Sequence, residues 1–135
     1  MYLYKSTLNS IDKTKAIADS LYKLSRKGDV FALYGDIGVG KTTFVRYFIS
    51  NATKTNYVPS PSYNIYFKYD SKKAEIYHMD AWRISNDLEV FNLGVLDFFQ
   101  DSIFLIEWAN KVDTYLPVSK LSITLEYSKN LRTIT

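Results

Sequence analysis

The chain has 135 residues, which fits one domain, and 47% of them are hydrophobic, enough to bury a core. The absence of cysteine excludes disulfides, thiolate metal sites and a cysteine nucleophile. A net charge of +3 is too small to argue for nucleic-acid binding by itself, and no apolar run approaches the roughly 20 residues that a membrane-spanning helix needs. We therefore expect a single domain spanning residues 1–135, cytoplasmic and without a membrane segment. A monomer is favoured for the free protein, whose oligomeric state the sequence leaves open.

The first third of the chain predicts a helix, a strand, a glycine loop and a second helix. Ser10 is a plausible N-cap for the first helix, and Gly28 is expected to cap its C-terminus. Four residues of this helix recur at helical spacing: Thr14, Ile17, Leu21 and Leu24. Residues 30–34 form a short apolar run, typical of a buried parallel strand. After the glycine loop, one apolar face predicts the second helix: Phe44, Phe48 and Ile49.

The middle of the chain predicts two strands and a helix. Residues 62–69 and 74–78 flank a polar turn and are expected to be strands. Asn86 and Glu89 can form a capping box for a helix that ends near Gly94.

Three strands are predicted beyond that helix. Residues 103–106 form another short buried strand, and residues 121–127 alternate between apolar and polar side chains. Residues 132–135 are expected to pair back on this last strand. The order of elements predicts an α/β fold, a mixed β-sheet flanked by helices.

The glycine loop carries the strongest motif of the chain. Residues 35–42 match the pattern Gly-x4-Gly-Lys-Thr, between an apolar strand and an amphipathic helix. Its glycines allow successive N–H groups to point inward as an anion nest, and the start of the following helix adds a positive dipole end. In an exposed loop of this kind, Lys41 would bind the β- and γ-phosphates, Thr42 would ligate Mg²⁺, and Thr43 would contact the α-phosphate. The motif therefore predicts a P-loop nucleotide-binding domain.

Two acidic residues that end apolar strands are candidates for holding the metal and the attacking water. Asp80 follows residues 76–79, and Glu107 follows residues 103–106. At the carboxyl edge of a parallel sheet, either carboxylate could reach Mg²⁺ directly or through water, so the pattern leaves their separate roles open. His78, the only histidine, is more often structural than a base in such a position.

An alternative reading is a GTPase-type switch. Residues 110–113 spell Asn-Lys-Val-Asp, which resembles the guanine-reading string of GTPases. The Asp-x-x-Gly element of those proteins is absent from the sequence, and Asn110 comes several residues after the strand. A small-molecule kinase is a third reading, but only four arginines are present to form the usual phosphate-binding lid.

Several strings together resemble the TsaE family, the ATPases of bacterial tRNA threonylcarbamoyladenosine synthesis. They are residues 35–44, Ser60-Pro61-Ser62-Tyr63, the stretch from Tyr77 to Arg83, and Ile106-Glu107-Trp108. Residues 89–94 and Arg132 agree with the same family. The resemblance covers nearly the whole chain.

The resemblance implies a P-loop ATPase that uses ATP and Mg²⁺. Its partners would be the subunits TsaB and TsaD, which modify the adenosine beside the anticodon in tRNAs that read codons beginning with A. ATP hydrolysis would reset that complex between turnovers, so activity alone would be weak, and tRNA would be contacted only through the complex.

The resemblance also implies roles for single residues. Thr42 and Glu107 would ligate Mg²⁺, Lys41 would bind phosphates, and Asp80 would orient or activate water or hold a metal-bound water. Ser62, on a loop near the γ-phosphate, stands where the family has Thr; Trp82 likewise replaces a Tyr. The full set expected to contact nucleotide is Asp36, Ile37, Gly38, Val39, Gly40, Lys41, Thr42, Thr43, Ser62, Trp108 and Arg132.

Overall fold

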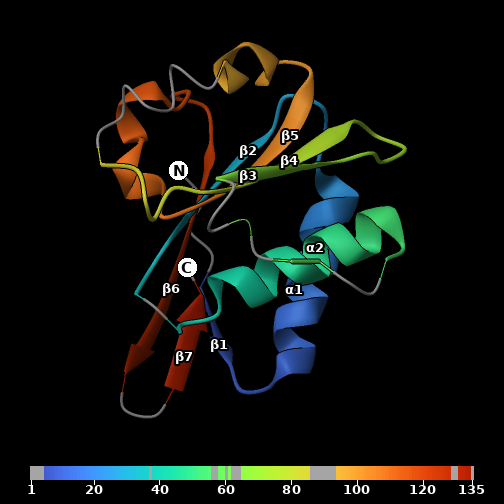
Figure 1. The fold of residues 1–135 in the computed structure, drawn as a ribbon. Helices are drawn as coiled ribbons and strands as arrows, with labels where there is room; N and C mark the ends of the chain where they lie inside the picture. The colour runs from blue at the N-terminus through green and yellow to red at the C-terminus, as the bar shows by residue number, and fades with distance from the viewer. Residues whose placement is uncertain are drawn as a thin grey trace.

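The computed structural model describes residues 5–36, 38–55, 58–59, 61, 65–85, 94–128 and 131–134. The elements in chain order are β1 (Ser6–Leu8), α1 (Ile11–Leu24), β2 (Val30–Tyr34), α2 (Lys41–Thr53), β3 (Tyr66–Tyr69), β4 (Glu75–Asp80), the 3₁₀ turn η1 (Val95–Phe98), β5 (Ser102–Glu107), the 3₁₀ turns η2 (Ala109–Lys111) and η3 (Asp113–Tyr115), β6 (Leu121–Ser128) and β7 (Leu131–Ile134) (Figure 1).

All seven strands belong to one sheet, in the order β1-β7-β6-β2-β5-β4-β3. The four central strands, β6, β2, β5 and β4, are mutually parallel, whereas the pairs at both edges are antiparallel. The predicted mixed sheet is therefore confirmed. The loop that follows β2 emerges at the carboxyl end of the parallel strands, where ligands of such sheets bind. Since β2 lies between β5 and β6, this loop is in the middle of that edge.

The two faces of the sheet are covered by different elements. Helices α1 and α2 pack against each other over one face, where they bury Phe31 and Leu33 of β2 and Leu105 of β5 (Figure 1). The other face buries Phe104 and Ile106 beneath the region of η2 and η3. Since side chains alternate along a strand, Glu107 shares the helix-covered face with Leu105. By the same alternation His78 and Asp80 share that face with Ile76 of β4.

The expected strands and helices are largely present, but two boundaries differ. The strand expected over residues 62–69 is β3, which begins at Tyr66, with residues 62–64 outside the described residues; the other difference is the end of α1. The helix stops at Leu24, not near Gly28, because Ser25 takes an extended backbone and its N–H and hydroxyl both bond to the carbonyl of Tyr22. Leu24 is consequently exposed, and Gly28 instead donates its N–H to the carbonyl of Ser102.

Two further comparisons with the sequence predictions concern the ends of the fold. The expected pairing of the C-terminal segment with the preceding strand is confirmed as β6–β7, but strand β1 was not predicted. The helix expected from Asn86 to Gly94 falls largely on residues 86–93, which lie outside the described residues. In the part of the chain that is described, no helix is both long and apolar enough to cross a bilayer.

Candidate functional site

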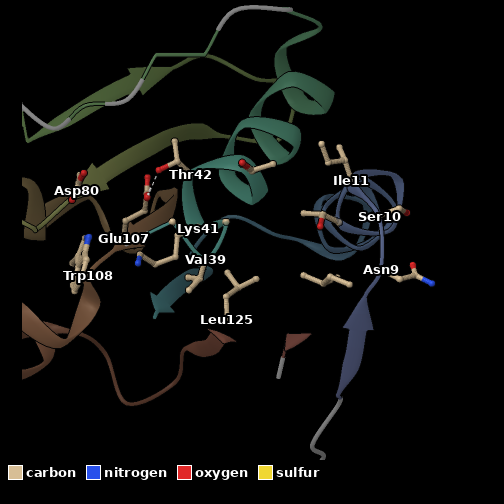
Figure 2. Close-up of a pocket in the computed structure, with 15 residues that line it drawn as sticks. Asn9, Ser10, Ile11, Val39, Lys41, Thr42, Asp80, Glu107, Trp108 and Leu125 are labelled. Carbon is tan, nitrogen blue, oxygen red and sulfur yellow. Dashed lines mark hydrogen bonds between the residues drawn. The ribbon is translucent and has the colours of Figure 1, made fainter. Parts of the chain in front are cut away.

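A cavity of about 630 Å³ opens at the carboxyl end of the central strands. Its size is within the range of small-molecule sites. Figure 2 shows two ends: one carries Lys41, Thr42 and Glu107 with their neighbours, and the other is formed by the start of α1. The lining residues are Leu8, Asn9, Ser10, Ile11, Thr14, Gly38, Val39, Gly40, Lys41, Thr42, Thr43, Asp80, Glu107, Trp108 and Leu125.

The phosphate loop presents a helix start that has no capping side chain. Gly40 precedes α2 with a left-handed backbone (φ 110°), a conformation that residues other than glycine rarely adopt. No side-chain hydrogen bond caps the helix. No acidic residue occupies the first turn. The first N–H groups of α2 and its positive dipole end are therefore suited to an anion such as a phosphate.

Lys41 is buried at this helix start, with 5% of its surface exposed, although Asp36 and Gly38 of the same loop are exposed as expected. Its ammonium group donates to the carbonyl oxygens of Gly35 and Asp36 and lies 4.1 Å from the centre of the Trp108 ring. Burial lowers the pKa of Lys41, and the nearby carboxylates of Glu107, Asp36 and Asp80 act in the opposite direction. The two carbonyl oxygens are neutral and compensate the charge of the ammonium group only in part. A phosphate would provide it with an anionic partner.

Thr42 and Glu107 meet across the boundary between α2 and β5. The Thr42 hydroxyl donates to Oε1 of Glu107 at 2.6 Å, the bond drawn as a dashed line in Figure 2. Glu107 is 2% exposed, and its Oε2 lies 2.6 Å from Nε2 of His78. A hydroxyl and a carboxylate held together beside a phosphate loop are the hard oxygen ligands that Mg²⁺ prefers.

The described residues contain no group of three or more His, Asp or Glu side chains placed to hold a metal ion. At nucleotide sites, Mg²⁺ is held by one or two protein ligands together with substrate phosphates and waters. The donor set at Thr42 and Glu107 therefore fits a Mg²⁺ ion that arrives with a nucleotide.

Asp80 ends β4, directly opposite Glu107 in the parallel β4–β5 register. Its Oδ1 accepts a hydrogen bond from the backbone N–H of Trp82 at 3.0 Å, and its own N–H donates to the carbonyl of Ile65. Glu107 lies on the strand next to β2 and bonds to Thr42, whereas Asp80 is one strand farther away. This geometry favours Glu107 as the metal ligand and leaves Asp80 beside it at the cavity wall.

Trp108 closes the phosphate end of the cavity. Its backbone is left-handed (φ 57°, ψ 44°), which is unfavourable for a residue other than glycine and occurs at functional sites. The Trp108 ring packs on Trp82, with the ring centres 4.4 Å apart, and Trp82 is 43% exposed. The strained backbone thus holds an aromatic face over Lys41.

The structure brings most of the predicted nucleotide-contacting residues to this cavity. Asp36 borders a second, smaller cavity behind the loop, and its carbonyl reaches Lys41. The backbone of Arg132 on β7 pairs with Leu8, which lines the main cavity. Ile37 and Ser62 lie outside the described residues.

Sequence reasoning missed the wall formed by β1 and α1. Leu8, Asn9, Ile11 and Thr14 line the cavity although no motif marks them. Ser10 was identified only as the N-cap of α1, a role that its bond to the N–H of Lys13 confirms. No local signal could have identified this wall, because it depends on which edge of the sheet the N-terminal strand joins.

The guanine-reading string lies elsewhere. Residues 110–113 fall on η2 and η3, and none of them is among the described residues that line the cavity. Oδ1 of Asp113 accepts a hydrogen bond from the hydroxyl of Tyr34 at 2.8 Å, a contact within the protein. This placement does not favour a guanine site.

Comparisons with known proteins point to one family. The family model described as threonylcarbamoyl adenosine biosynthesis protein TsaE matches residues 8–134. The tRNA threonylcarbamoyladenosine biosynthesis protein TsaE of Bacillus subtilis is 35% identical over 116 residues, 85% of this chain and 72% of that protein. Its counterpart of the same name in Haemophilus influenzae is 34% identical over 122 residues, 89% of this chain and 77% of that protein.

A solved structure supports the same assignment. The crystal structure of Bacillus subtilis YdiB superposes with a TM-score of 0.78 at 28% identity, covering 99% of this chain and 86% of that one. The family match extends over almost the entire chain and includes the phosphate loop and both acid-bearing strands. The chain therefore belongs to the TsaE family.

Proposed function

We propose that this protein binds and hydrolyses ATP with Mg²⁺ as a subunit of the machinery that makes tRNA threonylcarbamoyladenosine. The proposal is carried by the cluster of Lys41, Thr42 and Glu107 at the uncapped start of α2. The pathway comes from the printed names of the relatives, which are tRNA threonylcarbamoyladenosine biosynthesis proteins.

In this proposal the two ends of the cavity bind the two ends of the nucleotide. The N–H groups of the loop and the Lys41 ammonium group bind the phosphates, while the wall that contains Leu8, Ile11 and Leu125 contacts the adenine and ribose. Thr42 and Glu107 hold Mg²⁺, which supplies charge neutralisation to the phosphate oxygens when bound. Asp80, opposite Glu107, orients the attacking water.

The partners in this proposal are TsaB and TsaD, with tRNA contacted through the complex. Hydrolysis resets the complex between turnovers and is not the transfer of the threonylcarbamoyl group itself. The resemblance of the whole chain to the family supports this role. Trp82, exposed beside Trp108, places an aromatic side chain next to the mouth of the cavity, where a partner can approach.

The first test is calorimetry of the purified protein with Mg²⁺ and ATP, ADP or GTP, followed by hydrolysis assays with and without TsaB, TsaD and tRNA. We expect adenine nucleotides to bind in preference to GTP and hydrolysis to rise when all partners are present. Absence of binding both alone and with the partners would refute the proposal, and preferential binding of GTP would favour the switch reading.

Lys41→Ala tests the site within the same assays. Because it removes the cation aimed at the phosphates, we expect it to lower hydrolysis by about a hundredfold or more. Lys27→Ala is a matched control, since Lys27 is exposed in the turn before β2, at the opposite end of that strand from the phosphate loop. Equal activity of the Lys41 variant and the control would contradict the assignment.

Glu107→Gln tests the metal role because it keeps the size of the side chain and removes its charge. We expect the Mg²⁺ concentration needed for half-maximal hydrolysis to rise by about tenfold or more. An unchanged Mg²⁺ titration would move the metal role to Asp80.

A further inference from the structure

His78 is a buried polar side chain for which the proposed mechanism gives no role. It lies in the middle of β4, is 0% exposed, and stands on the sheet face covered by α1 and α2. Its Nε2 is 2.6 Å from Oε2 of Glu107, and its Nδ1 has no hydrogen-bond partner among the described residues. Leaving a buried ring nitrogen unpaired costs about 1 to 3 kcal/mol, so an apolar side chain would suit this position better for stability alone.

The register of the sheet explains how the two side chains meet. His78 is directly opposite Leu105 of β5, and Glu107 is two residues farther along that strand, on the same face. The pair is therefore a diagonal contact between neighbouring parallel strands. The backbone of two central strands fixes this contact, which makes it a rigid support for the carboxylate.

Both oxygens of Glu107 are held, but by different kinds of group. Oε1 accepts from the Thr42 hydroxyl, which is itself a candidate metal ligand, and Oε2 faces His78. A carboxylate only accepts hydrogen bonds, so Nε2 carries a proton and donates it. If the Thr42 oxygen bound a cation instead, the hydrogen bond from His78 would still hold the Glu107 carboxylate in place.

We infer that His78 is a positioning residue that orients the Glu107 carboxylate toward the metal by donating a hydrogen bond from Nε2. This inference rests on the proposed ATP and Mg²⁺ function and adds a supporting residue to it. Groups that orient metal-ligating side chains in this way affect metal affinity by about ten- to a hundredfold when they are removed.

Two amide substitutions separate this role from simple packing. The side-chain nitrogen of Gln can occupy the place of Nε2, whereas that of Asn occupies the place of Nδ1, which bonds to nothing in the described structure. His78→Gln should therefore keep the hydrogen bond to Glu107, and His78→Asn should lose it. Both variants lose the imidazole ring, so a purely structural role would affect the two alike.

The readout is Mg²⁺-dependent nucleotide binding, measured by calorimetry with a non-hydrolysable ATP analogue at a series of Mg²⁺ concentrations. We expect His78→Asn to weaken the apparent Mg²⁺ affinity by about ten- to a hundredfold and His78→Gln to stay close to the unmodified protein. Nucleotide affinity without Mg²⁺ should be the same in all three. Urea unfolding of each variant shows whether it is folded under the conditions used.

A second measurement uses the unmodified protein and does not depend on a variant folding. Because His78 is the only histidine, labelling with isotope-enriched histidine gives nitrogen NMR signals from one ring, which report its tautomer. A proton on Nε2 supports the inference, and a proton on Nδ1 alone overturns it. Equal Mg²⁺ dependence of the Gln and Asn variants, or a loss confined to Gln, overturns it as well. If the unmodified protein bound no nucleotide, the proposed function would fail, while the tautomer would still test the bond.

Discussion

Gly35, the first residue of the phosphate loop, lies so close to β6 that no side chain fits between them. A Cβ atom at this position would be 2.4 Å from the carbonyl oxygen of Leu125 and 2.9 Å from a methyl group of Val39. Its φ of +138° is also a value that side chains disfavour. The loop is therefore attached to the sheet through close backbone contact at its first glycine.

Gly35→Ala should destabilise the fold by about 3 kcal/mol, because the backbone of β6 or of the loop must shift in addition to the torsional strain. Gly94→Ala is the control, since Gly94 also has a positive φ (74°) but nothing lies within 4 Å of an added Cβ. Strain alone should cost that variant about 1 kcal/mol. Urea unfolding measures both, and equal losses would show that the contact with Leu125 is unimportant.

Tyr34 and Asp113 form a contact between the end of β2 and η3. Burial raises the pKa of Tyr34 to about 12, and the hydrogen bond to Asp113 and its negative charge act in the same direction. An unfolded tyrosine ionises near pH 10, so the folded state binds the proton more tightly. The stabilisation is complete below about pH 10 and disappears as the pH rises to about 12.

Tyr34→Phe should therefore reduce the free energy of unfolding by about 1 kcal/mol at neutral pH. The difference between the variant and the unmodified protein should shrink toward zero between about pH 10 and pH 12, since the unmodified protein loses this contribution there. Urea unfolding of both proteins across the pH series provides the measurement. A difference that stays constant up to the highest pH would contradict the link to ionisation of Tyr34.

At the scale of elements, helix α1 is capped by a residue from a distant hairpin. The ammonium group of Lys73, between β3 and β4, donates to the carbonyl oxygens of Tyr22, Lys23 and Ser25 and lies 4.5 Å from the centre of the Tyr22 ring. Carbonyl groups at the end of a helix lack the usual partner four residues farther on, although that of Tyr22 also accepts from Ser25. The contact satisfies them and places a positive charge at the negative end of the helix dipole.

Lys73→Met keeps the length of the side chain and removes the cap. We expect the free energy of unfolding to fall by about 1 to 2 kcal/mol, with salt reducing the difference. Lys72→Met provides the matched control, because Lys72 is the exposed neighbour of Lys73. Similar effects of the two substitutions would show that the charge of the hairpin, not the cap, matters.

The sequence predicted those elements whose pattern is local. The run of residues 30–34, the apolar face of α2 and the turn between β3 and β4 each carry their own signal, so β2, α2 and the hairpin were found. The end of α1 was misplaced because Ser25 leaves the helical backbone there, and Lys73, about fifty positions away, binds the carbonyls at that end. Strand β1 has three residues, and its partner β7 lies at the other end of the chain, so its local pattern is too short to be read.

The same distinction holds for the site. The pattern placed Asp80 and Glu107 at the same edge of the sheet and left their roles open, and only the family resemblance paired Glu107 with Thr42. Their hydrogen bond confirms that they meet. The His78–Glu107 contact could not be inferred, since it depends on a diagonal in the register of β4 and β5. The wall formed by β1 and α1 depends on the order of strands in the sheet.

At the scale of the whole molecule, the two ends of the chain are tied together. Strand β1 pairs with β7, and β7 pairs with β6, which joins the parallel core. One continuous sheet thus links the described segments from Ser6 to Ile134. That residues 1–135 act as one domain stays a prediction.

A single domain should unfold in one cooperative transition. We expect differential scanning calorimetry to show one peak whose calorimetric and van't Hoff enthalpies agree. With ligand in excess, binding should shift the same peak upward as a unit. Two resolved peaks, or a peak that splits when nucleotide is added, would contradict a single unit.

The packing of Trp82 on Trp108, with Lys41 over the second ring, has a practical consequence. These are the only two tryptophans of the chain. When the protein is excited at a wavelength that only tryptophan absorbs, nearly all of its fluorescence therefore comes from the mouth of the cavity. When Lys41 turns away from the indole, the surroundings of the emitting rings change. Intrinsic fluorescence can therefore follow occupancy of this one place in the unlabelled protein, without interference from the twelve tyrosines.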